Sequence, residues 1–119
     1  MTSEVLARRI AAAVDEKQGD DIVALDVRDL VSYTDFLVIC TARNERQAKA
    51  IHDEVRGQLK AEGVLPARVE GELRGSWLLL DYLDCVLHIF TAEMRGYYRL
   101  EQLWGEAARL SLDDVRGAA

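Results

Sequence analysis

Two apolar runs separated by only a few residues constrain the fold of this chain more than any other feature of its sequence. Residues 77–82 and 85–90 are both dominated by leucine, isoleucine, valine and aromatic side chains. So short a connection makes the two segments antiparallel neighbours, because parallel strands need a crossover of a dozen or more residues. The chain is therefore expected to contain a β-hairpin within a sheet.

The alternation of side chains along this hairpin predicts two faces of different character. We expect Asp81 to pair with Asp84 across the turn, and side chains on one face then recur with period two. This register places Leu79 opposite Val86 and Trp77 opposite His88. The wholly apolar set is expected to face the core and comprises Leu78, Leu80, Cys85, Leu87 and Ile89. The other face comprises Trp77, Leu79, Asp81, Asp84, Val86 and His88.

This second face is a candidate partner-binding surface. Tryptophan is enriched at interface hot spots, where an aromatic anchor is often ringed by charges. Asp81 and Asp84 would repel each other, and burying them without partners would cost several kcal/mol, so they are expected to face water or a basic partner. Glu70 extends this acidic rim. The alternative is that a helix of the same chain covers the face.

The remaining elements predict a mixed α+β fold in one domain, residues 1–119. Ser3 and Gly19 bracket a helix over residues 4–18, and a capping-box pair, Asn44 and Gln47, starts a second helix that ends at Gly63. Branched and apolar runs predict strands at 22–27 and 36–41. Residues 68–73 are expected to form a short strand of the kind found at a sheet edge.

The C-terminal part predicts one or two short helices followed by a frayed tail. Tyr97, Leu100 and Trp104 recur at helical spacing, which favours packing roles for Tyr97 and Trp104 and a semi-exposed position for Tyr98. Tyr98 thereby joins the candidate surface. The apolar pattern stops after about residue 112, where fraying is expected.

The composition limits the kind of partner that the chain is expected to bind. The net charge is −6, so the chain is expected to be repelled by bare nucleic acid and to meet a basic protein surface. No stretch approaches the roughly 18 apolar residues of a membrane span, and the start lacks the order of a signal peptide, so we expect a cytoplasmic protein. Cys40 and Cys85 lie in apolar runs typical of reduced core thiols.

No motif in the sequence indicates a cofactor or a metal ion. His52 and His88 have no second ligand at zinc-like spacing, and His88 has no nucleophile placed to pair with it. The competing hypothesis is a metal-dependent nucleotidyltransferase, which needs paired carboxylates on adjacent strands and a Gly-Ser turn before a helix. Here a strand is expected after Gly75-Ser76. We therefore expect no catalytic residue, cofactor-binding residue or metal ligand.

Several segments together resemble the ribosomal silencing factor family, also called the RsfS or Iojap family. They are GSWLLLDY at 75–82, HIF at 88–90, RGYYRLEQLW at 95–104, DV at 26–27, TDFLVI at 34–39 and RQAKAI at 46–51. The set covers nearly the whole chain. One departure is Leu83, where the family usually has glycine after its aspartate-tyrosine turn, so a turn that needs positive φ would be strained.

The resemblance implies a function as well as a fold. It implies docking on the large ribosomal subunit, on the ribosomal protein numbered fourteen in that subunit, and steric exclusion of the small subunit, which lowers translation. It also implies a homodimer when the protein is free, and a layered fold similar to nucleotidyltransferases without their activity. On this hypothesis the hairpin face, with Trp77 and Leu79 as anchors, binds the basic partner.

Overall fold

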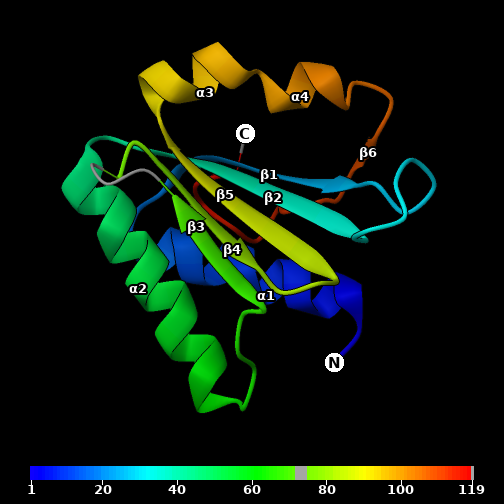
Figure 1. Ribbon diagram of the computed structural model, residues 1–119, viewed down its shortest axis with the longest axis horizontal. Helices are drawn as coiled ribbons and strands as arrows, with labels where there is room; N and C mark the ends of the chain where they lie inside the picture. The colour runs from blue at the N-terminus through cyan, green and yellow to red at the C-terminus, as the bar shows by residue number, and fades with distance from the viewer. Residues whose placement is uncertain (72–74, 119) are drawn as a thin grey trace.

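The computed structural model describes residues 1–71 and 75–118, and in these ranges the two longest helices lie on one side of a β-sheet (Figure 1). Helix α1 (Ser3–Glu16) is capped by Thr2, whose side chain accepts a hydrogen bond from the N–H of Val5, so Ser3 is not the cap that we expected. Helix α2 (Glu45–Ala61) is capped by Asn44, as predicted. Each cap satisfies a backbone donor in the first turn of its helix.

Gln47 ties the start of α2 to the end of α1. Its Nε2 donates to the carbonyl oxygens of Lys17 and Gln18 at 3.1 and 2.9 Å. Its Oε1 accepts the N–H of Arg43 at 2.6 Å, whereas a reciprocal capping box would use the N–H of Asn44. The expected box is therefore half formed, and the second side-chain group holds the two helices together.

The described residues form a six-stranded mixed sheet in the order β3-β4-β5-β2-β1-β6. Neighbouring strands are antiparallel except β2 and β5, which are parallel. This arrangement confirms the predicted mixed α+β class. The end of the strand expected at residues 68–73 lies outside the described residues. The strands are β1 (Asp20–Asp26), β2 (Phe36–Ala42), β3 (Arg68–Gly71), β4 (Trp77–Asp81), β5 (Cys85–Thr91) and β6 (Ala108–Arg109).

The hairpin of β4 and β5 forms with a register two residues away from the expected one. Asp81 pairs with Val86, and the pairs that follow along the ladder are Leu79 with His88 and Trp77 with Phe90. The predicted pairing of Asp81 with Asp84 was wrong because residues 82–84 form the turn. A shift of two residues preserves the parity of every side chain, so the division into two faces holds and Phe90 joins the face of Trp77.

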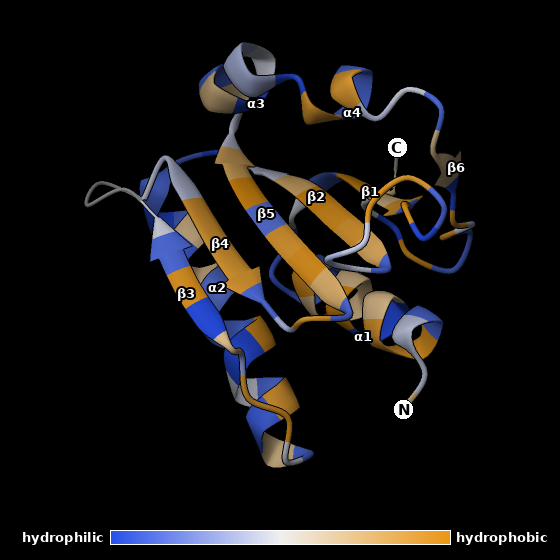
Figure 2. Ribbon diagram, turned by 45° about the vertical axis from the view of Figure 1, so that its right-hand side comes forward, coloured by the Kyte–Doolittle hydropathy of each residue, from blue (hydrophilic) through white to orange (hydrophobic). Residues whose placement is uncertain are grey.

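Each face of the sheet carries its own apolar cluster. The larger cluster lies under α1 and α2 and includes the predicted core residues Leu80, Cys85, Leu87 and Ile89. Cys40 is also buried there, and burial raises the pKa of its thiol to about 12. Figure 2 shows apolar residues along β2, β4 and β5, whereas edge strand β3 is mostly polar. The sheet is therefore sealed on the helix side.

The chain then crosses to the second face through two short helices, which we call the arm: α3 (Ala92–Tyr98) and α4 (Leu100–Leu103) (Figure 1). Arg99 has a left-handed backbone with φ of +49° and separates the two helices. Beyond the arm the chain does not leave the molecule at residue 112. Leu112 and Val115 are buried in the larger cluster, and the N–H of Gly117 donates to Asp15 Oδ1 at 3.1 Å.

None of the helices in the described part of the chain combines the length and the apolarity that crossing a membrane would require.

Candidate partner-binding surface

The candidate surface is the outward face of β3, β4 and β5, which points away from α1 and α2. The sheet register places Glu70, Leu79 and His88 in one row across these strands, and Arg68, Asp81 and Val86 in the next. Trp77 and Phe90 form a third row at the far end of the hairpin from its turn. Five of the residues predicted for the site thus share one face, Tyr98 of α3 meets Trp77 at its border, and Asp84 lies in the turn beside it.

The arm covers only part of this face. Helix α3 contacts β5 and β2, and the partly buried residues that pack on the second cluster from the arm and the segment after it are Met94, Leu100, Trp104 and Ala107. The predicted packing role of Trp104 is confirmed. Trp77 is half-buried and stays at the border of the covered region, so the face is neither sealed nor fully open. Leu79, expected at the surface, is only 7% exposed.

Trp77 is the centre of an aromatic cluster. Its ring lies nearly parallel to those of His88 and Phe90, with centroids 6.2 and 6.3 Å away, and it meets Tyr98 of α3 at 5.8 Å. Its Nε1–H donates a hydrogen bond to Nδ1 of His88 at 3.2 Å. The two side chains are therefore in contact, although the strand register pairs Trp77 with Phe90 and not with His88. Offset contacts of this kind add stabilisation beyond the area that they bury.

The hydrogen bond from Trp77 determines the protonation state of His88. Since Nδ1 accepts from the indole, the imidazole is neutral there, and protonation of Nδ1 would remove the bond. Burial lowers the pKa of His88 to about 4, which favours the same neutral form. His88 thus orients Trp77 and presents no charge at neutral pH.

The acidic residues are arranged differently from the prediction. Asp81 and Asp84 are not opposite each other, and Asp81 Oδ2 instead lies 3.3 Å from Nε of Arg68, while its Oδ1 accepts the N–H of Leu83 at 2.8 Å. Arg68 also approaches Glu70 at 4.0 Å. Sequence reasoning missed Arg68, although a cation two residues before Glu70 on an edge strand is on the same face. Glu70 and Asp84 are the acidic groups most open to a partner.

The turn itself carries the strain expected of it. Leu83 has φ of +70°, in the left-handed region that glycine adopts without penalty, and it is exposed. The amide of Leu83 is held by Asp81, as described above, so the aspartate contributes to the turn as well as to the surface. A side chain in this conformation costs on the order of 1 kcal/mol relative to glycine.

Arg95 anchors the arm, and sequence reasoning missed this role too. Its guanidinium donates to Thr41 Oγ1 at 2.7 Å and to the carbonyl of Asp21 at 2.6 Å. Both oxygens of Glu101 accept from it at 3.0 Å, and this pairing lowers the pKa of the Glu101 carboxyl. Since α3 and α4 bury no residue of their own, this clamp fixes where Tyr98 stands.

The described residues offer little for chemistry. They contain no group of three histidine, cysteine, aspartate or glutamate side chains that could hold a metal ion. His88 uses Nδ1 to hold Trp77, and burial raises the thiol pKa of both cysteines, which makes them poor nucleophiles.

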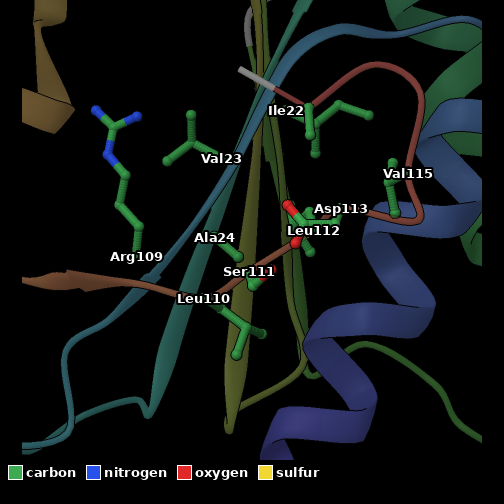
Figure 3. Close-up of a pocket in the computed structure, with 10 residues that line it drawn as sticks. Ile22, Val23, Ala24, Arg109, Leu110, Ser111, Leu112, Asp113 and Val115 are labelled. Atoms are coloured by element: carbon green, nitrogen blue, oxygen red, sulfur yellow. The ribbon is translucent and has the colours of Figure 1, made fainter.

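A separate cavity of about 370 Å³ lies at the other edge of the sheet (Figure 3). It is lined by β1 and the C-terminal segment, with Ile22 and Ala24 from the strand and Leu110, Leu112 and Val115 from the segment. None of the residues predicted for the partner-binding site lines it. The cavity and the outward face of the hairpin are thus two distinct places on the molecule.

Comparison with known proteins finds a matching family, related sequences and a related structure. The profile of the family described as "Ribosomal silencing factor during starvation" matches residues 1–119. The ribosomal silencing factor RsfS of Halalkalibacterium halodurans is 35% identical over 115 residues, 97% of this chain and 98% of that protein. Protein Iojap from the chloroplast of Zea mays is 37% identical over 87% of this chain and 45% of that protein. A crystal structure of a protein from Chromobacterium violaceum superposes with a TM-score of 0.85 at 33% identity and covers 88% of both chains.

Proposed function

This chain belongs to the ribosomal silencing factor family, and we propose that it lowers translation by docking on the large ribosomal subunit and excluding the small one. The proposed contact is the ribosomal protein numbered fourteen in the large subunit. The mechanism is steric occlusion, in which the bulk of the bound protein occupies space that the small subunit needs. No bond is made or broken, and no cofactor takes part.

The half-buried Trp77 at the border of the arm is the observation that carries the proposal. A large aromatic side chain that is already oriented by His88 loses little conformational freedom on binding, so its remaining exposed surface can be buried at low entropic cost. Tryptophan is one of the residue types enriched at interface hot spots. Tyr98 beside it enlarges the apolar area that a partner can cover.

Charge supports a basic protein as the partner. The chain has a net charge of −6, and Glu70 and Asp84 are exposed at the rim of the surface. Arg68 offsets part of this negative charge, so the steering comes from the whole molecule as much as from the rim. Complementary charge of this kind mainly raises the association rate.

Two further properties are proposed on the strength of the family resemblance. The free protein is a homodimer, and it works in the cytoplasm with the ribosomes that it regulates. Binding has no nucleic-acid sequence specificity, since the contact proposed is with protein.

Co-sedimentation with purified large subunits in a sucrose gradient at low magnesium tests the proposal. Trp77→Ala should weaken binding by roughly 2 kcal/mol or more, because it removes the anchor of the surface. Tyr33→Ala, at an exposed tyrosine in the connection between β1 and β2, is the matched control and should bind like the unchanged protein. A folded Trp77→Ala protein that sediments undiminished with large subunits would refute this surface.

Glu70→Lys supplies a variant that does not touch the aromatic cluster. It reverses an exposed charge at the rim and should slow association, most strongly at low salt. The enzyme alternative predicts instead a magnesium-dependent nucleotide turnover that is lost when Asp81 or Asp84 is replaced by asparagine. Turnover of that kind, without subunit binding, would replace the silencing proposal.

A further inference from the structure

We propose that the partner-binding surface continues from the sheet onto the arm, where Tyr97 and Glu93 together receive a lysine or arginine side chain of the same partner. This inference rests on the proposed function, which it extends to a second contact point. The contact point lies on α3, where the sequence pattern predicted a packing role for Tyr97.

Tyr97 is exposed to a degree that packing cannot explain. Its side chain is 76% exposed, the largest fraction among the exposed large apolar residues of the described ranges, so the expected packing role was wrong. The helical period that suggested it is interrupted at Arg99, where the backbone turns left-handed and α3 ends. Tyr97 therefore points to solvent, whereas Leu100 and Trp104 pack inward.

The ring of Tyr97 is nevertheless held in a defined place. It meets Tyr98 edge-on, with centroids 5.3 Å apart and planes at 86°. Tyr98 in turn lies 5.6 Å from Phe90 and contacts Trp77, and the Arg95 clamp fixes the helix that carries both tyrosines. An unbroken series of ring contacts thus runs from the hairpin to the outer side of the arm. A partner seated on Trp77 comes directly beside Tyr97.

The chemistry around Tyr97 favours a cation. Glu93 precedes it by four residues in α3, so the two side chains lie on the same side of the helix. Glu93 is exposed and forms no ion pair within residues 1–71 and 75–118. Arg95 is engaged in the clamp, and Arg99 donates to the carbonyl of Gly96 at 3.1 Å. Arg43 and Arg46 line a pocket with Glu93, but within the described residues neither forms an ion pair with it. A tyrosine face next to a free carboxylate attracts an ammonium or guanidinium group.

Equilibrium binding to purified large subunits tests this contact, with Tyr97→Ala, Glu93→Gln and the control Tyr33→Ala. Tyr33 is also highly exposed, 63%, but lies in the connection that leads to Phe36, and Phe36 is level with Cys85 rather than with Trp77. We expect Tyr97→Ala to weaken binding about tenfold and Glu93→Gln about threefold. Tyr33→Ala should have no effect. All three positions are exposed, so the fold should be retained.

The outcomes separate this inference from the function on which it rests. If Trp77→Ala loses binding while Tyr97→Ala binds as tightly as Tyr33→Ala, the surface stops at the sheet and the arm contact is refuted. If the unchanged protein does not bind large subunits, the proposed function fails and the arm contact fails with it. Weaker binding by Tyr97→Ala and Glu93→Gln, with a smaller salt dependence for Glu93→Gln, supports the cation contact.

Discussion

The two faces of the sheet are closed in different ways. On one face, α1 and α2 are long enough to present continuous apolar stripes, and they bury residues such as Ile10, Ile51 and Leu87 completely. On the other, α3 and α4 are short helices with no buried residue, and a polar clamp at Arg95 holds them in place. The first face holds the larger buried cluster. The second holds a smaller one, with Ile39 and Phe90 buried, and leaves part of Trp77 exposed at the border of the arm.

The difference follows from helix length. A helix of several turns repeats its apolar stripe often enough to gain from burial along its whole length, whereas a helix of one or two turns does not. The arm therefore depends on a few specific contacts, and it covers only part of the face. On the proposed function, the more completely buried side of the sheet and the side that meets a partner are opposite faces.

Truncating a residue on the sealed face should have the largest effect. Leu87→Ala removes a fully buried side chain under α1 and α2 and should lower the free energy of unfolding by roughly 2–5 kcal/mol. Urea denaturation followed by circular dichroism measures this change. The folded fraction should bind large subunits with unchanged affinity. A loss well under 1 kcal/mol would mean that the sealed face is not the main source of stability.

Removing the clamp on the partly covered face should have a smaller effect on stability and a distinct effect on the arm. Arg95→Met keeps much of the apolar side chain but leaves Glu101 and Thr41 without their donor, so unfolding should become easier by about 2 kcal/mol. Amide hydrogen exchange should accelerate in α3 and α4 and stay unchanged in α2. Uniform acceleration across both faces would contradict a locally held arm.

Titration of His88 should change the stability with pH, and this is the smallest of the expected effects. Its pKa of about 4 in the folded protein lies below the ordinary value of 6.5, so protons bind the unfolded chain first as pH falls. The stabilisation that neutral His88 gives the folded protein is therefore complete above about pH 7. The free energy of unfolding should decline by about 1 kcal/mol between this pH and about pH 5.5. Denaturation of the unchanged protein and of His88→Gln, compared over this range, isolates the effect from that of the carboxylates. Equal pH dependence in both proteins would rule it out.

Much of the fold could be predicted because it depends on local patterns. Asn44 started a helix where a capping residue preceded an amphipathic stretch, and the core face of the hairpin followed from period two alone. The hairpin register could not be obtained in this way. Asp81 had two possible partners of the same parity, Asp84 and Val86, and only the turn geometry around Leu83 selects between them.

The candidate site shows the same division. The sequence by itself determined which side chains share the face of Trp77, since alternation along a strand is a property of neighbouring residues. Tertiary structure alone decided that Arg68 neutralises Asp81, that Arg95 clamps the arm to Thr41, and that Tyr97 faces solvent. Those contacts join segments 13 and 54 residues apart, or depend on where a helix ends, and no local period encodes such distances.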